Sequence, residues 1–126
     1  MRATTILLAT IAAMLSQAVF ADIVRHASIP SQFIGTWAAS TDDCNKAGKS
    51  AIVLSATSYA EGAKVCTVDW VDERPGANAP IYSAHLKCAA PENQPSNIVL
   101  WKKAADQISA GATLDTLKTL QRCPAK

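Results

Sequence analysis

The stretch from Cys66 to Cys88 constrains the fold of this chain more than any other. Two segments in which polar and apolar residues alternate, 64–73 and 81–89, flank a turn-rich segment at 75–80 that holds two prolines and a glycine. This pattern is typical of two antiparallel strands joined by a loop. Since the midpoint between the two cysteines falls inside the loop, we predict a β-hairpin with a disulfide between Cys66 and Cys88.

With Cys66 opposite Cys88, the register of the hairpin sorts its side chains by polarity. The face that carries the disulfide is mostly apolar and pairs Val68 with Leu86, Trp70 with Ala84, and Asp72 with Tyr82. The other face is mostly polar and pairs Thr67 with Lys87, Asp69 with His85, and Val71 with Ser83. A half-buried antiparallel sheet requires this separation, so the register predicts that Trp70 faces the core.

Residues 1–21 are typical of a secretory signal peptide. Arg2 gives a basic start, residues 6–15 form an apolar run, and small residues lead to a cleavage position after Ala21. The apolar run is too short to cross a bilayer, which takes about 20 residues. We therefore expect a secreted or periplasmic protein with no membrane span.

Removing residues 1–21 from the 126 leaves 105 residues, a length suited to one domain. We expect residues 22–31 to form a polar lead-in segment and residues 32–126 to form a single β domain. All four cysteines lie in that domain, and an even number in an exported chain indicates two disulfides. Once the hairpin takes its pair, Cys44 is left to bond with Cys123.

Short β-branched and aromatic segments recur along the chain at a spacing of roughly ten residues. The predicted strands cover 33–38, 51–54, 57–61, 64–73, 81–89, 97–103 and 107–109. Leu114, Leu117 and Leu120 then repeat every third residue, which predicts a short C-terminal helix capped by Thr113. The fold class is therefore mainly β, a small antiparallel barrel or sandwich of about six to seven strands with two disulfides.

The triplet Gly35-Thr36-Trp37 on the first predicted strand, together with Arg122 beside the last cysteine, resembles the lipocalin-like (calycin) β-barrels. In those proteins a G-x-W tryptophan packs across the barrel floor against a basic residue from near the chain end. The resemblance implies that Trp37 lies under the guanidinium of Arg122, in a cation–π contact of about 0.5–2 kcal/mol.

A second segment, Ser55-Ala56-Thr57-Ser58-Tyr59, is similar to the Ser-Gly-x-x-Tyr loop of the small exported lysozyme inhibitors of bacteria, with alanine in place of the glycine. This likeness implies that a small exported β-protein held by disulfides can act by binding to an enzyme and blocking it.

The remaining residues argue against several function classes. A formal charge of +2, with acidic and basic residues interspersed, does not favour nucleic acid as a partner. Asp69, His85 and Ser83 share the polar hairpin face, but Ser83 and His85 stand about 7 Å apart along one strand, too far for a direct hydrogen bond. We therefore interpret them as surface groups and predict no enzyme activity, no metal site and no cofactor.

Two binding functions remain. The first is recognition of a protein in the cell envelope, as an inhibitor or immunity-type factor, and it predicts a filled interior and an exposed patch made by loops such as 40–50 and 91–97. The alternative is a lipocalin-like binder of a small apolar molecule, which predicts an apolar cavity open at one barrel end. Each tryptophan, at 37, 70 and 101, lies on a predicted strand and is expected in the core or in the lining of such a cavity.

Overall fold

Strands dominate the part of the chain that the computed structural model describes, residues 23–45, 51–89 and 95–124. Within these residues there are nine strands, and the helical segments are three short 3-10 turns. The strands are β1 (Val24–His26), β2 (Gly35–Ala38), β3 (Ile52–Leu54), β4 (Ser58–Glu61), β5 (Lys64–Arg74), β6 (Ile81–Cys88), β7 (Pro95–Ala104), β8 (Gln107–Gly111) and β9 (Lys118–Arg122). The 3-10 turns cover Ser31–Phe33, Thr41–Asn45 and Leu114–Thr116.

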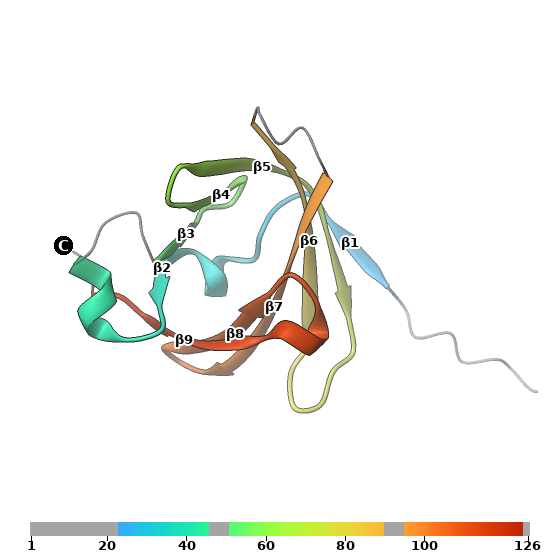
Figure 1. The fold of residues 1–126 in the computed structure, drawn as a ribbon. Helices are drawn as coiled ribbons and strands as arrows, with labels where there is room; N and C mark the ends of the chain where they lie inside the picture. Colours follow the sequence, from blue (N-terminus) through green and yellow to red (C-terminus); the bar gives the residue numbers. More distant parts are fainter. Residues whose placement is uncertain (1–22, 46–50, 90–94, 125–126) are drawn as a thin grey trace, which may run out of the picture.

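Strands β2 to β9 close into an eight-stranded antiparallel barrel (Figure 1). Each of these strands pairs with the next in sequence, and β9 returns to pair with β2. The long strand β5 pairs with β4 through its first half and with β1 through its second half, so β1 is an extra strand on the barrel wall. Of the two predicted architectures, the structure therefore has the barrel, with more strands than the six or seven expected.

The interior of the barrel follows the alternation of the strands. On β6 every second residue is buried, and these are Tyr82, Ala84, Leu86 and Cys88. The same alternation brings residues such as Leu54, Leu100 and Ile108 into one hydrophobic core. Because each strand turns one face inward, a short chain can build this core without a helix.

The predicted disulfides are both present. Cys66 and Cys88 lie opposite each other on β5 and β6, with their Cα atoms 3.9 Å apart, and both belong to the core. Cys44, in the turn after β2, bonds to Cys123, the residue that follows β9. This second bridge packs with Ala38 and Ala51 in a small separate cluster.

The predicted hairpin register is correct only near the disulfide. The pairs of Cys66, Thr67 and Val68 are as predicted, but a β-bulge between Val68 and Trp70 then moves Trp70 opposite His85. Because side chains alternate with a period of two, one extra residue turns all later residues to the other face. Val71 is therefore fully buried, and the prediction that Trp70 faces the core is wrong.

The predicted C-terminal helix is also wrong beyond its first turn. Leu114–Thr116 forms a single 3-10 turn, in which the Thr113 backbone N–H donates to the Thr116 hydroxyl at 3.1 Å and the two threonine hydroxyls bond to each other. Leu120 then lies on β9, buried in the core. Hydrogen bonding of β9 to both β8 and β2 closes the barrel, and this tertiary pairing outweighs the three-residue spacing of the leucines.

The segment before β2 closes one end of the barrel (Figure 1). Ile29 and Phe33 from this segment are buried, and the backbone N–H of Ile29 donates to the carbonyl of Ala56 at 2.9 Å. The lead-in residues thus contribute both β1 and part of the core. The expected signal peptide, residues 1–21, lies outside the described residues.

Trp37 and Arg122 form the floor of this closed end. Trp37 is fully buried, and its indole N–H donates to the carbonyl of Phe33 at 2.8 Å. The Arg122 guanidinium lies 4.3 Å from the centre of the Trp37 ring, which is the contact that the calycin resemblance implied. Gly35 has a φ of +142°, which residues with a side chain rarely adopt. It also leaves space for Arg122, because an added Cβ would lie 2.7 Å from Arg122 Nη1.

Candidate functional site

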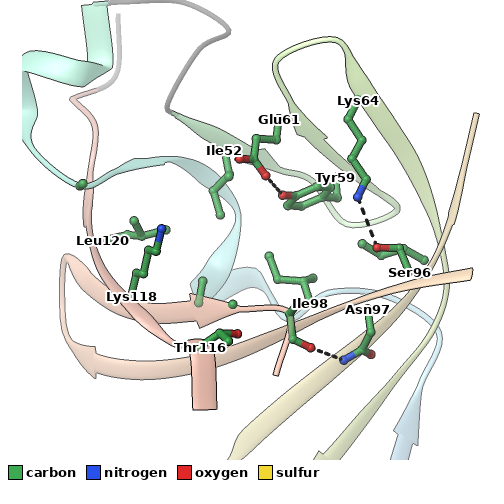
Figure 2. A pocket seen from close by; sticks show the side chains of 15 residues that line it. Ile52, Tyr59, Glu61, Lys64, Ser96, Asn97, Ile98, Thr116, Lys118 and Leu120 are labelled. Carbon is green, nitrogen blue, oxygen red and sulfur yellow. Dashed lines mark hydrogen bonds between the residues drawn. The ribbon is translucent and has the colours of Figure 1, made fainter. Parts of the chain in front are cut away.

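The opposite end of the barrel is open and holds a cavity of about 560 Å³. Its lining comes mainly from strands β3 to β9, and Figure 2 shows the labelled side chains around it. The buried part of the lining is mostly apolar and consists of Ile52, Tyr59, Leu86, Ile98, Ala110 and Leu120. The outer lining is mostly polar and includes Glu61, Lys64, Ser96, Asn97, Thr116 and Lys118. This volume is within the range of small-molecule sites, roughly 300–1,000 Å³.

The change from polar to apolar lining follows from the strand period. Residues two apart on one strand share a face, so the side chain at the mouth and the next one inward belong to the same wall. Lys118 precedes Leu120 in this way on β9, and Ser96 precedes Ile98 on β7. On β4 the order is reversed because that strand runs toward the mouth, so Tyr59 lies deeper than Glu61. The cavity therefore has an apolar interior below a polar rim.

Tyr59 is the one deep residue of the lining with a polar end. Its hydroxyl donates a short hydrogen bond to the Glu61 carboxylate (Figure 2). Burial raises the pKa of Tyr59 well above its ordinary value, and the neighbouring Glu61 raises it further through the hydrogen bond and its charge. Tyr59 is therefore a neutral phenol, and it holds the Glu61 carboxylate against the cavity wall.

The rim carries two lysines. Lys64, at the start of β5, reaches Ser96 Oγ at 3.5 Å, and Lys118, at the start of β9, stands on another wall of the mouth (Figure 2). The ion pairs among the described residues involve neither of these lysines. Glu61 and Lys64 are register partners in the hairpin of β4 and β5. In the part of the rim that the structure describes, two ammonium groups stand with one carboxylate.

A second group of polar residues lies on the outer wall, where β1, β5 and β6 run side by side. His85 stacks on Trp70 with ring centres 4.3 Å apart, and the Arg25 guanidinium lies 4.8 Å from the centre of the Trp70 ring. Asp72 accepts from His85 Nε2 at 2.9 Å and from Trp70 Nε1 at 3.3 Å, and its other oxygen is 3.4 Å from Arg25 Nε. Burial opposes ionisation of Asp72, but these three partners together keep its pKa below the ordinary value.

The predicted grouping of Asp69, His85 and Ser83 is changed by the bulge. Asp69 is exposed at the bulge, and Asp72 takes its place as the carboxylate beside His85. Ser83 Oγ donates to Asn97 Oδ1 at 2.9 Å. His85 Nε2 bonds to Asp72, and the Ser83 hydroxyl bonds to Asn97. Asp69, His85 and Ser83 therefore do not form the hydrogen-bonded relay of a serine hydrolase.

The other residues singled out in the sequence have structural surroundings. Trp101 lies on the outer wall, where its indole N–H donates to the carbonyl of Ala79 at 3.1 Å and the Lys103 ammonium lies 3.3 Å from its ring centre. In the segment that resembles the lysozyme inhibitors, the Ser55 and Ser58 hydroxyls bond to each other, and Tyr59 points into the barrel. Of the loops 40–50 and 91–97 that were expected as contact surfaces, residues 46–50 and 91–94 lie outside the described residues.

The sequence reasoning missed the residues of the cavity. Lys64, Leu86 and Ile98 were assigned to strands, but their convergence on one barrel end depends on closure of the sheet. The sequence signal for the lining is a polar residue followed two positions later by an apolar one, as in Lys118 and Leu120. Because a helix was predicted for that segment, these two residues were not expected on one face.

Among the described residues, no three His, Cys, Asp or Glu side chains are grouped so that they could hold a metal ion. The same residues include no helix with the length and hydropathy needed to cross a membrane. Comparison of the chain with protein-family models, with curated proteins and with solved structures finds no match.

Proposed function

We propose that this protein is an exported, non-catalytic binding protein that holds a small, largely apolar molecule in the open end of its barrel. The observation that carries the proposal is the cavity of about 560 Å³ with an apolar interior and a polar rim. A protein that acts only through its outer surface has no need of such a space, and unfilled apolar cavities cost stability. The lipocalin-like resemblance supports the same function, through the contact of Trp37 with Arg122 on the barrel floor.

Two further observations support binding without catalysis. The outer-wall histidine, His85, is engaged by Asp72 and stacked on Trp70, away from the cavity lining. Among the described residues of the lining, Tyr59 is the buried one that carries a polar group, and burial keeps its hydroxyl neutral. A raised tyrosine pKa does not suit a general base near neutral pH.

The proposal is tested with N-phenyl-1-naphthylamine, a neutral apolar dye whose fluorescence rises in an apolar site. The oxidised protein should bind one dye per chain. Ala110→Phe fills the interior, and Ala112→Trp narrows the exposed rim, so each should weaken dye binding at least tenfold. Ala104→Phe, on an exposed position of β7 away from the cavity, is the matched control and should bind normally.

Circular dichroism and thermal unfolding should show that each variant remains folded. Two outcomes would refute the proposal. One is the absence of saturable dye binding to the folded protein. The other is unchanged binding in folded Ala110→Phe and Ala112→Trp.

A second candidate is recognition of an envelope protein, and one observation favours it. Val53 and Val65 are 47% and 54% exposed on the outer wall, and Ala60 is the register partner of both, so the three form an apolar row across β3, β4 and β5. Apolar side chains gathered on a surface are often part of a protein contact. Val53→Lys with Val65→Lys should then abolish crosslinking to a partner in envelope extract while leaving dye binding intact. Equal crosslinking by wild type and variant would remove this candidate.

A further inference from the structure

The rim of the cavity has an unbalanced charge, and this charge bears on the kind of molecule that fits. Among the described residues of the lining, Lys64 and Lys118 stand at the mouth and Glu61 is the one carboxylate. The Glu61 carboxylate is turned toward the wall by the Tyr59 hydroxyl. Lys64 has only a long hydrogen bond to Ser96, and Lys118 takes part in none of the ion pairs among the described residues.

The position of Lys118 is the more informative of the two. Lys118 and Leu120 share the inward face of β9, so the ammonium lies at the mouth above a buried leucine of the cavity interior. Lys64 has the same relation to Cys66 on β5, where the buried disulfide forms part of the core. A molecule whose apolar part occupies the interior would therefore have its outer end between two ammonium groups (Figure 2).

We propose that the cavity selects an amphipathic molecule with a single anionic head group, such as a carboxylate on an alkyl chain. The chain lies among Ile52, Ile98 and Leu120, and Lys64 and Lys118 hold the head group at the rim. This inference rests on the proposed function. Opposite charges a few ångströms apart attract even where water screens them, whereas a cationic head would be repelled. Glu61 lowers the net attraction without reversing it, because one carboxylate faces two ammonium groups.

The test compares three probes that share a ten-carbon chain, namely decanoate, decanol and decyltrimethylammonium, as competitors of the bound naphthylamine dye. At low ionic strength and below the micelle concentration, decanoate should bind about fivefold to tenfold more tightly than decanol, from two exposed charge contacts. The ammonium probe should bind more weakly than decanol. The ratio of the dissociation constants of decanol and decanoate should fall toward one in 0.5 M salt, where the Debye length is only about 4–5 Å.

Charge-removing variants locate the head group. Lys118→Gln should reduce the decanoate preference to about twofold, and Lys64→Gln with Lys118→Gln should abolish it, with a larger change in decanoate affinity than in decanol affinity. Glu61→Gln keeps an acceptor for the Tyr59 hydroxyl and should strengthen decanoate binding about twofold. Lys87→Gln is the matched control, because Lys87 is exposed at the same end of β6 but points away from the barrel interior.

The outcomes separate this inference from the proposed function. Equal binding of decanol and decanoate, with the dye still bound, overturns the inference and leaves the proposed function standing. An effect of Lys87→Gln equal to that of Lys118→Gln also overturns it, because the preference would then reflect overall charge. Failure of the dye and of all three probes to bind refutes the proposed function itself.

A further experiment distinguishes two sources of the ligand, because free amphiphiles and anionic membrane lipids both carry an anionic head group on an apolar chain. Displacement of the dye by monomeric decanoate supports a molecule taken into the barrel. Cosedimentation with phosphatidylglycerol vesicles, without displacement of the dye by decanoate, overturns the inference, because the lysines would then bind a lipid surface.

Discussion

Replacing Arg122 by methionine tests how the closed end of the barrel is held together. The guanidinium donates to the carbonyls of Ile34 at 2.8 Å and Gln32 at 3.0 Å, lies over Trp37, and pairs with Asp106 at 3.2 Å. Arg122 is the partner of Trp37 in the β2–β9 register, so these contacts join the last strand to the first strand of the barrel and to the lead-in turn.

The cost of the substitution can be worked out contact by contact. Hydrogen bonds to a charged group contribute about 1.5–3 kcal/mol each when buried, and partial exposure of this side chain reduces that to about 1 kcal/mol each. The cation–π contact adds about 0.5–1 kcal/mol. The ion pair adds at most about 0.5 kcal/mol, because Asp106 is largely exposed. Methionine still covers the Trp37 ring, so we expect a loss of about 3 kcal/mol in the free energy of unfolding.

Urea unfolding followed by tryptophan fluorescence measures this loss. With a slope of about 1.5 kcal/mol per molar urea, the midpoint should fall by about 2 M. Arg122→Lys keeps the charge but not the forked donors and should give an intermediate loss. Asp106→Asn removes only the ion pair and should cost less than about 0.5 kcal/mol. A loss below about 1 kcal/mol in Arg122→Met, or an equal loss in Asp106→Asn, would contradict the reasoning.

Three further predictions concern the disulfides, the cavity and the bulge. Replacing Cys44 and Cys123 by serine should lower the free energy of unfolding in urea by about 4 kcal/mol, and replacing Cys66 and Cys88 should lower it by about 3 kcal/mol. The first loss is larger because that bridge closes 79 residues of chain against 22. A larger loss for the hairpin bridge would contradict this. The raised pKa of Tyr59 means that the neutral phenol stabilises the fold fully below about pH 10, the ordinary tyrosine pKa, and that this stability is lost as the pH rises further. In Tyr59→Phe the melting temperature should therefore fall less steeply as the pH rises above about 10. The same fall in wild type and variant would contradict the role of Tyr59. Deleting Asp69 should lower stability by less than about 1 kcal/mol, because Val68 and Trp70 then become consecutive, Trp70 stays opposite His85 and Val71 still faces inward. Asp69→Ala should be nearly neutral in the same thermal melt, and a loss of about 3 kcal/mol on deletion would contradict the assignment of Asp69 as the bulged residue.

The bulge at Asp69 shows where the reasoning from sequence stopped. The alternation of residues 64–68 correctly indicated the register next to Cys66 and Cys88, because a disulfide fixes which residues face each other. Beyond Val68 the same alternation also allowed Trp70 to face inward, and no local signal marks the extra residue. The tertiary structure decides between the two registers: Val71 is buried in the barrel core, and Trp70 stacks on His85 on the outer wall.

The segment from Thr113 to Arg122 shows a second limit. The start of the turn at Thr113 was readable, because hydrogen bonding between threonines three residues apart is a local feature. The strand that follows was not readable, because β9 exists through its hydrogen bonds to β8 and β2. The cavity has the same origin, since its lining residues come from seven strands and meet only when the barrel closes.

The sequence by itself determined the mainly β class and the two cysteine pairs, and its resemblance to the calycin barrels implied the contact of Trp37 with Arg122. Each of these depends on local alternation, on the number and position of the cysteines, or on a short motif. Only the tertiary structure decided the number of strands, the faces of Trp70 and Val71, and the open end with its apolar interior and lysine rim. The physical reason is that barrel closure is a long-range property, because the pairing of the first strand with the last sets both the register and the space that the strands enclose.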